Sequence, residues 1–372
     1  MCVPPEELQA LAATYGTPFY LFDGDTMRKS IAALRDAFPS DIDYYVPAAY
    51  CGRRGLLRFL REQGIGVSCC SEEELQRAVE CGFSGRLLRY AALTLREDTA
   101  RLLRNLDASL TILSPLAIPR CVPRRVELRC HLPNFSKPHL GAANVRHDPL
   151  GLTPEEIAVT LEPLCRMGAE SLGLSMPQGR NVLEERFYAD KLDALMEVRS
   201  EILTMSDGTL STADLGNGFG VEYRRLHPQP DMQKAGALLK ERVEQTPGIR
   251  GLALSPWQYL LEPASILVGR VEGTLKRGED MVITDISPAH TQITYPVRTR
   301  YVSISGKAKV VGRVYCSVMG ARGEAAQWLG RKLILPPAEN GDLLVFHDAG
   351  CCLPAGHVTC LLREADGTVS RL

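Results

Sequence analysis

Short apolar runs with the character of β-strands alternate with helix-like stretches through about the first 260 residues of the chain. The stretch 25–38 shows the helical pattern, because Met27, Ile31, Leu34 and Phe38 recur at spacings of three and four residues. The strand-like runs are 17–22, 43–48, 66–70, 86–90, 109–113, 125–130, 171–175 and 212–215. Repeated units of this kind predict parallel strands covered by helices.

The pattern changes beyond about residue 265, where strand-like runs follow one another without long helical stretches between them. These runs are 266–275, 280–285, 297–304, 309–318, 343–346 and 357–363. The change predicts a separate all-β domain at the end of the chain.

Composition narrows the class of protein. A net charge of −1 over 372 residues does not favour nucleic acid or an anionic membrane surface as a partner. No apolar run has the length that a membrane span needs, and the first residues lack the features of a secretory signal, so we expect a cytoplasmic protein. The 12 cysteines include no Cys-x-x-Cys pair, which favours free thiols over disulfides or a zinc site.

Several short motifs occur in a fixed order. They are Thr17-Pro18-Phe19-Tyr20-Leu21-Phe22-Asp23, Tyr44-Tyr45-Val46-Pro47-Ala48-Ala49, Ser71-Glu72-Glu73-Glu74-Leu75, Leu128-Arg129, Asp214-Leu215-Gly216-Asn217-Gly218-Phe219-Gly220, Leu261-Glu262-Pro263, and Asn340-Gly341-Asp342 followed by Asp348-Ala349-Gly350. In order and spacing they resemble the fold-type III pyridoxal-phosphate (PLP) decarboxylases, which share an alanine racemase-like barrel. The most similar members are the diaminopimelate and ornithine/arginine decarboxylases.

The resemblance implies an α/β fold, a (β/α)8 TIM barrel with a C-terminal all-β domain. The expected domains are an N-terminal segment 1–24 that contributes to the β domain, a barrel at 25–265 and a β domain at 266–372. It also implies a dimer with sites at the interface, either a homodimer or a heterodimer with a related enzyme.

The chain departs from the family's pattern at five positions of its site. Pro47 stands where the family has the lysine that holds PLP as a Schiff base, and proline has no amine. Ser175 replaces a histidine that stacks on the cofactor, and Ser265 falls where an arginine is expected. Cys316 matches the family's catalytic-type cysteine only with a shift of one residue, and Cys352 replaces a tyrosine that contacts the phosphate. The resemblance therefore predicts no covalently held cofactor, does not favour non-covalent PLP, and leaves the catalytic residues unknown.

Other matched positions are candidates for ligand binding. The turn formed by Gly216, Asn217 and Gly218 either presents N–H groups to an anion or keeps its glycines for positive φ angles. Arg129 and Glu262 either bind a ligand or pair with each other as a relic of an older site. A last candidate is Glu74, in a capping box that starts with Ser71.

The cysteines and histidines leave further alternatives. One cysteine of each pair, Cys69-Cys70 and Cys351-Cys352, is expected to point inward, because side chains alternate along a strand. With Cys51, Cys316, His347 and Asp348 these thiols form either a new thiol or metal site or, as we predict, ordinary core contacts. The eight-residue spacing of His131, His139 and His147 predicts a solvated loop, and no metal site is expected.

Three functional hypotheses follow. The first is a non-catalytic pseudoenzyme that pairs with or regulates an enzyme of amino-acid, polyamine or specialised metabolism, because Pro47 cannot hold PLP. The second is a repurposed, PLP-independent enzyme whose barrel mouth binds a small amino-acid-like or phosphorylated ligand. The third is a conventional PLP-dependent amino-acid decarboxylase. We predict the first.

Overall fold

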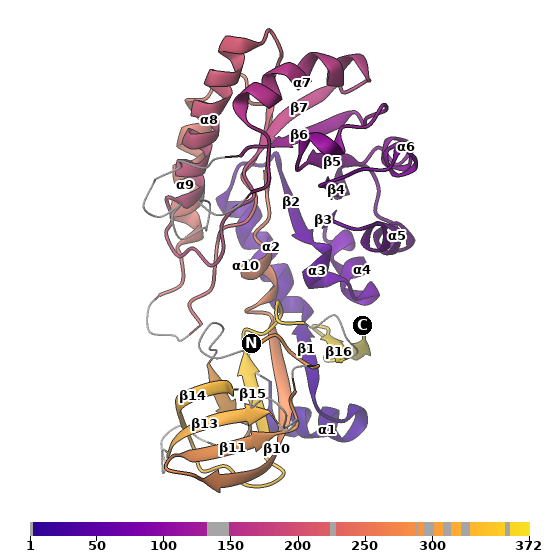
Figure 1. Cartoon of the computed structure of the whole chain (residues 1–372). Helices are drawn as coiled ribbons and strands as arrows, with labels where there is room; N and C mark the ends of the chain where they lie inside the picture. Colours follow the sequence, from indigo (N-terminus) through magenta and orange to yellow (C-terminus); the bar gives the residue numbers. More distant parts are fainter. Residues whose placement is uncertain are drawn as a thin grey trace. The chain divides into compact units, whose positions relative to one another are not determined.

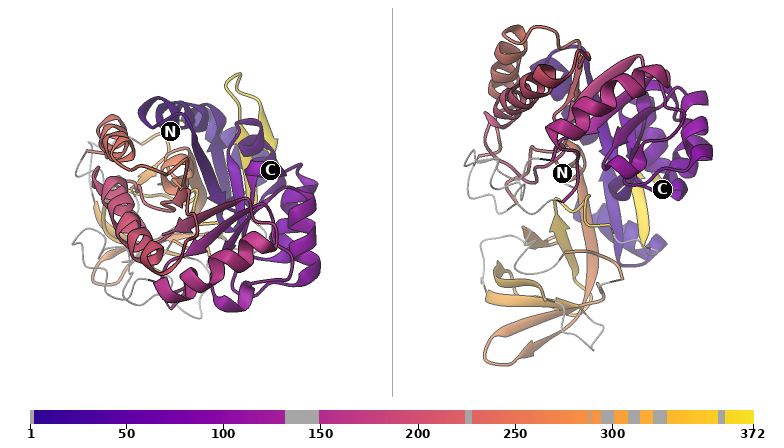
Figure 2. Two further views of the ribbon diagram at one scale, coloured as in Figure 1. Left: turned by 90° about the horizontal axis from the view of Figure 1, so that it is seen from above. Right: turned by 45° about the horizontal axis from the view of Figure 1, so that its top comes forward.

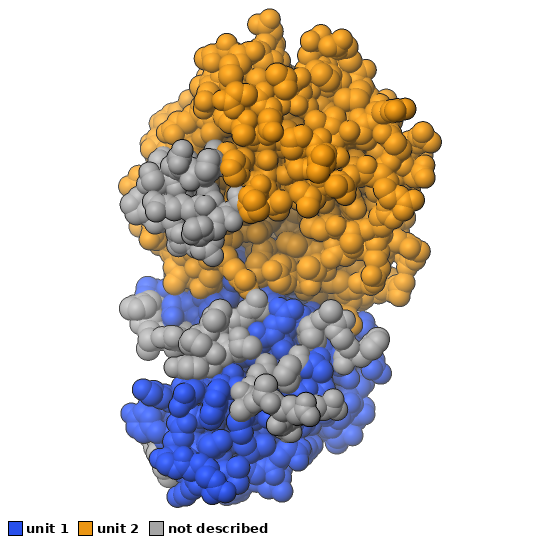
Figure 3. Space-filling model, in the orientation of Figure 1, with its two compact units in different colours: residues 1–30, 221–228, 258–372 blue, residues 31–220, 229–257 orange. Residues whose placement is uncertain are grey.

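The computed structural model, shown in Figure 1 and from other sides in Figure 2, describes residues 3–131, 149–223, 228–287, 289–293, 301–307, 314–320, 328–353 and 358–372. The chain divides into two compact units (Figure 3). Unit 1 comprises residues 1–30, 221–228 and 258–372, and unit 2 comprises residues 31–220 and 229–257. This division into units does not test the domain boundaries that we expected after residues 24 and 265, and they stay predictions.

Unit 2 contains a closed barrel of parallel strands, which confirms the predicted (β/α)8 barrel (Figure 1). The ring closes where the first strand pairs with the last, with Ile42 opposite Leu252. The eight strands of the ring are β2 (Ile42–Pro47), β3 (Gly66–Cys69), β4 (Leu88–Ala92), β5 (Ser109–Ile112), β6 (Arg125–Arg129), β7 (Ser171–Ser175), β8 (Thr212–Asp214) and β9 (Gly251–Leu254).

Helices surround the ring of strands (Figure 2). They are α2 (Gly24–Ala37), α3 (Ala48–Cys51), α4 (Arg54–Glu62), α5 (Glu72–Glu80), α6 (Glu97–Asn105), α7 (Pro154–Arg166), α8 (Phe187–Met205) and α9 (Met232–Glu244), with short 3-10 turns at Gly85–Leu87 and Pro115–Ala117. Helix α10 (Trp257–Leu261) follows β9 where the chain leaves unit 2. The predicted helix at 25–38 is confirmed as α2, and its four apolar positions, the last of them just after the end of the helix, are buried.

Local capping explains where helix α5 begins. The Ser71 hydroxyl accepts the backbone N–H of Glu74 (3.2 Å), as the predicted capping box requires. The Glu74 carboxylate reaches back to the N–H of Cys70 (2.7 Å) rather than to that of Ser71. The candidate ligand residue Glu74 therefore already stabilises a helix N-terminus.

Unit 1 is built on a nine-stranded sheet, in agreement with the predicted all-β domain. Strand β1 lies inside this sheet, antiparallel to β10 and parallel to β16, with Phe19 opposite both Val268 and Thr359. The strands are β1 (Phe19–Asp23), β10 (Ser265–Lys276), β11 (Asp280–Thr284), β12 (Val302–Ile304), β13 (Val314–Gly320), β14 (Trp328–Leu335), β15 (Leu343–His347), β16 (Thr359–Arg363) and β17 (Val369–Arg371).

Helix α1 (Pro5–Tyr15) covers part of this sheet. Its Leu8 and Leu11 pack in one apolar cluster with Phe19 and Ile266. The first strand and helix of the chain thus join the later strands because the apolar faces need each other for burial. Across the described residues, no helix combines the length and the apolar character that crossing a membrane requires.

Candidate active site

The carboxyl ends of the barrel strands bring several predicted site residues to one end of unit 2. Pro47, Cys69, Arg129 and Ser175 are the last residues of β2, β3, β6 and β7. Catalytic groups of such barrels lie at this end. Pro47 links β2 to the short helix α3, and its carbonyl accepts the thiol of Cys51 (3.5 Å).

A buried ion cluster lies inside the barrel. Arg89, on β4, is 3% exposed and donates to Asp214 Oδ2 and to Glu127 Oε1, at 2.9 Å each. Its guanidinium also lies 3.9 Å from the ring centre of Tyr45. One cation therefore serves two buried carboxylates, from β8 and β6, and ties three strands together.

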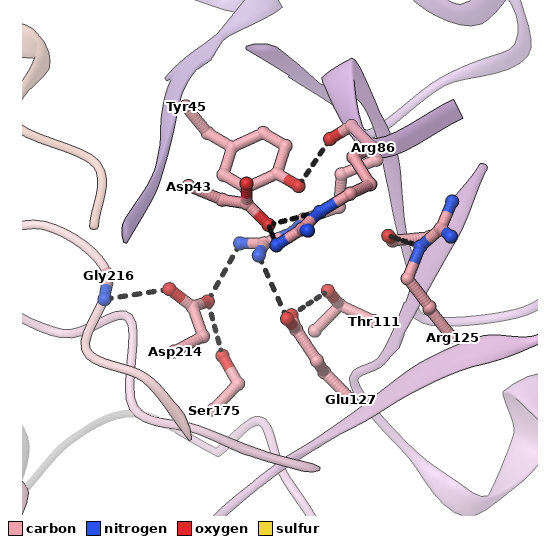
Figure 4. Close-up of polar contacts among 11 residues, drawn as sticks. Asp43, Tyr45, Arg86, Thr111, Arg125, Glu127, Ser175, Asp214 and Gly216 are labelled. Atoms are coloured by element: carbon pink, nitrogen blue, oxygen red, sulfur yellow. Dashed lines mark hydrogen bonds and ion pairs between the residues drawn. The ribbon is translucent and has the colours of Figure 1, made fainter. Parts of the chain in front are cut away.

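Asp214 connects this ion cluster to the predicted site residues through hydrogen bonds. Its Oδ2 accepts the hydroxyl of Ser175 (2.8 Å), and its Oδ1 accepts the N–H of Gly216 (2.9 Å), as Figure 4 shows. Ser175, which we expected in place of a stacking histidine, is fully buried and committed to this carboxylate. The structure thus joins Ser175, Asp214 and the glycine-rich turn in one hydrogen-bonded unit.

The electrostatics of the cluster follow from burial. Burial raises the pKa of Glu127 to about 7, against the attraction of Arg89 and a hydrogen bond from Thr111 (3.1 Å). Burial by itself would lower the pKa of Arg89, but the carboxylates of Asp214 and Glu127 raise it above its usual value. The cation is therefore fixed, and Glu127 is the member of the cluster that titrates near neutral pH.

A cavity of about 360 Å³ opens at the other end of the barrel, where the strands begin. Asp43, Arg86 and Arg125 lie on its walls, and Figure 4 shows Asp43 beside Arg86. Arg86 pairs with Asp43 (2.9 Å), and Arg125 pairs with Asp107 (3.2 Å). Because residues at this end of such barrels usually serve stability, we assign these ion pairs a structural role.

The glycine-rich turn follows β8. Gly216 has a φ of +56°, and a Cβ atom there would collide with the backbone of Pro177, so glycine is required twice over. The N–H of Gly216 is held by Asp214, and that of Asn217 donates to the carbonyl of Pro177 (3.2 Å). Among the described residues none accepts the N–H of Gly218.

A lysine that sequence reasoning missed lies against this turn. Lys191, on α8, is fully buried and donates to the carbonyls of Gln178 (2.6 Å), Leu215 and Asn217 (3.1 Å). It also lies 5.0 Å from the ring centre of Phe187. Burial lowers the pKa of Lys191 to about 7. A sequence signal existed, because Lys191 interrupts an otherwise apolar helix face.

An aromatic pair adjoins the turn from two other elements. The rings of Tyr50, on α3, and Trp257 are stacked with centroids 4.0 Å apart. Trp257 Nε1 donates to the side chain of Asn217 (3.1 Å). The Asn217 side chain is thus held by an indole, while its backbone carbonyl is held by Lys191.

The thiols match the core interpretation in part. Cys69 is buried and Cys70 exposed, which confirms the expected alternation at this pair. Cys351 and Cys352 are both buried, so the same expectation is wrong there, because these residues follow the end of β15 in a turn rather than in a strand. Burial raises the pKa of Cys69 and of Cys51, so both thiols stay protonated. A cluster of three or more side chains suited to a metal ion does not occur in the described ranges.

Other predicted positions belong to unit 1. The Ser265 hydroxyl donates to the carbonyl of Glu262 (3.0 Å), and the Cys352 carbonyl accepts the hydroxyl of Tyr20 (3.0 Å). Burial raises the pKa of Cys316, on β13, to about 11, which leaves it a neutral thiol. These positions stay predictions as site residues.

Two further predictions have no outcome here. Arg129 and Glu262 belong to different units, so their pairing stays a prediction. Of the three histidines expected in a loop, His139 and His147 lie outside the described residues. His131 follows β6 outside any helix or strand.

Sequence reasoning found the turn but missed the charges around it. Arg89, Glu127 and Lys191 belong to no motif that we singled out, and Asp214 was counted only as the start of the glycine-rich segment. Charged residues inside strands or apolar helix faces are the available signal, because they are rarely buried without partners.

Known proteins resemble this chain over most of its length. Residues 25–268 match the profile of the family described as "Pyridoxal-dependent decarboxylase, pyridoxal binding domain". Diaminopimelate decarboxylase of Streptomyces coelicolor is 26% identical, with 92% of this chain and 82% of that protein covered. The diaminopimelate decarboxylase of Deinococcus radiodurans is 24% identical, with 94% and 89% covered.

Solved structures agree on the fold. The diaminopimelate decarboxylase of Helicobacter pylori, complexed with L-lysine, superposes with a TM-score of 0.81 at 16% identity, covering 98% of this chain and 95% of that chain. A lysine/ornithine decarboxylase of Vibrio vulnificus, complexed with putrescine, gives 0.76 at 16% identity, covering 98% of both chains.

These findings correct one expectation. The prediction that no cofactor is held covalently, with non-covalent PLP not favoured, conflicts with the match to a pyridoxal-dependent family and is withdrawn. It was drawn from five single positions spread along the chain, whereas the match covers the whole barrel, including the glycine-rich turn. The turn fits a phosphate, since no residue that the structure describes accepts the N–H of Gly218. Position 47 does not fit the aldehyde, since proline has no amine.

Proposed function

Because this chain belongs to the family of pyridoxal-dependent decarboxylases, we propose that it binds pyridoxal 5′-phosphate at the carboxyl end of its barrel and acts on an amino acid of the diaminopimelate or ornithine class. The observation that supports this most is the glycine-rich turn. Gly216 keeps the turn in its conformation, and the N–H of Gly218, which no described residue accepts, is left for a phosphate.

The chain's own residues would then have distinct tasks. Gly218 binds the phosphate through its N–H, and Arg129 adds a positive charge at the same end of the barrel. Asp214, held by Arg89 and Ser175, fixes the start of the turn. The cofactor, when bound, supplies an electron sink for the negative charge that carbon dioxide loss leaves behind.

Decarboxylation also needs an amine for the cofactor's aldehyde. Pro47 does not provide one, so the proposal requires a lysine elsewhere in this chain or in a partner. The dimer expected from the sequence, with itself or with a related enzyme, belongs to this proposal as well.

Two measurements test it. Binding of PLP and of pyridoxal, which lacks the phosphate, is compared by absorbance titration of the purified chain. The PLP complex is then reduced with borohydride, and peptide mass mapping locates any adduct. Release of carbon dioxide is followed with meso-diaminopimelate, L-ornithine, L-lysine and L-arginine. Tighter binding of PLP, an adduct on one lysine and release from one substrate support the proposal. Equal binding of PLP and pyridoxal would remove its basis.

Pro47 favours a second candidate, a cofactor-binding chain that does not decarboxylate and that acts through a related enzyme. The variant Pro47→Lys separates the two, because it restores an amine where the resembled family has one. If wild type binds PLP without adduct or turnover, while Pro47→Lys forms an adduct at residue 47, the second candidate holds. An adduct on another lysine in the wild type excludes it.

A further inference from the structure

Lys191 is a charged residue in the protein interior, where lysine is rarely found. It is fully buried, and in the described parts of the chain none of the ion pairs includes it. Its ammonium is held instead by three backbone carbonyls, those of Gln178, Leu215 and Asn217. A buried ammonium without a paired carboxylate is costly, so its position calls for an explanation beyond packing.

The peptide plane supplies that explanation. In a trans peptide the carbonyl of one residue and the N–H of the next point in opposite directions. The carbonyls of Gln178 and Asn217 point at Lys191, so the N–H groups of Gly179 and Gly218 point away from it. Neither N–H has an acceptor among the described residues.

The packing keeps this arrangement in place. A Cβ atom at Gly179 or Gly218 would meet the ring of Phe187 at 2.6 Å. The ring lies one helical turn before Lys191 on the same face of α8. The two glycines therefore rest on the helix that presents the ammonium, and their peptides have little freedom to rotate.

We propose that Lys191 is a positioning residue that aims the N–H groups of Gly179 and Gly218 at a phosphate monoester and strengthens them as donors. An ammonium bound to one side of a peptide polarises it, which increases the positive charge at the N–H on the other side. This inference rests on the proposed function, and the phosphate is that of the cofactor. The lysine itself does not touch the ligand.

The arrangement couples phosphate binding to a proton. Burial lowers the pKa of Lys191, the Asp214 carboxylate raises it in part, and Arg129 lowers it, so that the pKa comes to about 7. A further titratable group at the turn is the Tyr188 hydroxyl, which donates to the carbonyl of Gly216 (3.3 Å) and whose pKa is raised by burial. A phosphate beyond the peptides favours the charged lysine. Above pH 7 binding therefore takes up a proton, and affinity falls as the pH rises.

The test uses pyridoxine 5′-phosphate, which has no aldehyde and so cannot react with any lysine. Pyridoxine is the comparator, because it shares the ring's titrating groups and lacks only the phosphate. Calorimetric titrations at pH 7.5 and 8.5, in two buffers of different ionisation enthalpy, measure affinity and proton uptake. For the wild type we expect the affinity gained from the phosphate to fall by up to about tenfold per pH unit, with uptake of up to one proton.

Two variants complete the design. Lys191→Met should lose at least about tenfold of the phosphate-dependent affinity and its pH dependence. Lys234→Met is the matched control, since Lys234 lies on α9 with its side chain 63% exposed, and it should behave as the wild type. A Lys191→Met protein that still prefers the phosphorylated ligand with the same pH profile overturns the inference. If that variant does not fold, absence of proton uptake by the wild type overturns it. A wild type that does not distinguish the two ligands refutes the proposed function itself.

Discussion

Replacing Arg89 by methionine removes the cation that pairs with both Asp214 and Glu127 in the barrel. Both ion pairs are 2.9 Å long, and the Arg89 side chain is 4% exposed. The carboxylates are nearly as buried, at 4% for Asp214 and 12% for Glu127. Breaking a buried pair by removing one partner costs about 3–5 kcal/mol, because the remaining charge is uncompensated. We expect a loss within this range at pH 7.

The loss should also depend on pH. Without Arg89 the pKa of Glu127, already about 7, rises further, so the folded variant keeps a proton that the unfolded chain has lost. Its stability therefore falls as the pH rises. Above pH 7 the wild type has ionised Glu127 and does not share this slope. The difference between the two proteins should widen between pH 7 and 9 by up to about 1.4 kcal/mol per pH unit.

Urea denaturation followed by circular dichroism measures both quantities. The control is Arg86→Met. The Arg86 side chain is 61% exposed and pairs with Asp43 at the end of the barrel where the strands begin. It should cost at most about 1 kcal/mol, with no slope in this pH window. The reasoning is refuted if Arg89→Met costs no more than Arg86→Met, or if its cost stays constant from pH 7 to 9.

Three further changes, one of them with a control variant, have defined outcomes. Ser71→Ala removes the N-cap of α5 and should cost about 1 kcal/mol in thermal or urea denaturation, whereas no loss would show that the cap does not contribute. Gly216→Ala should cost about 3 kcal/mol through its positive φ and its collision with Pro177. Gly278→Ala, at a φ of +77° in open space, should cost only about 1 kcal/mol, and equal losses at the two sites would contradict the packing argument. Glu127→Gln should flatten the pH profile of stability: the raised pKa makes the wild type lose stability as the pH rises from about 4.5 to 7, and an unchanged profile would show that Glu127 is not the titrating group.

The barrel was predictable because its signals are local. Alternating strand and helix patterns need only neighbouring residues, and α2 shows its apolar spacing directly in the sequence. The start of α5 follows in the same way from Ser71 and Glu74, which act within one turn of helix. The glycine-rich turn was found through the resemblance of its motif to the family's, and the positive φ of Gly216 explains why glycine stands at that position.

The charges around the turn were not predictable. Arg89 and Asp214 are separated by 125 positions in the chain, and Lys191 reaches carbonyls at Gln178 and Asn217. No short-range pattern relates such residues, because their distances are fixed only when the barrel closes. Local pattern also failed at Cys351 and Cys352. We expected them to alternate as a strand pair, whereas they follow β15 in a turn and are both buried.

The sequence by itself determined the fold class, the family's motifs and the absence of an amine at Pro47, because each depends on residue identity and local spacing. The tertiary structure alone decided which charges meet. Barrel closure places one arginine between two acids, and the packing of α8 places Lys191 behind the turn. Hydrogen bonds and ion pairs form only when their groups lie within a few ångströms, and buried charges lose their hydration, so the roles of these residues are set by folded distances rather than by chain positions.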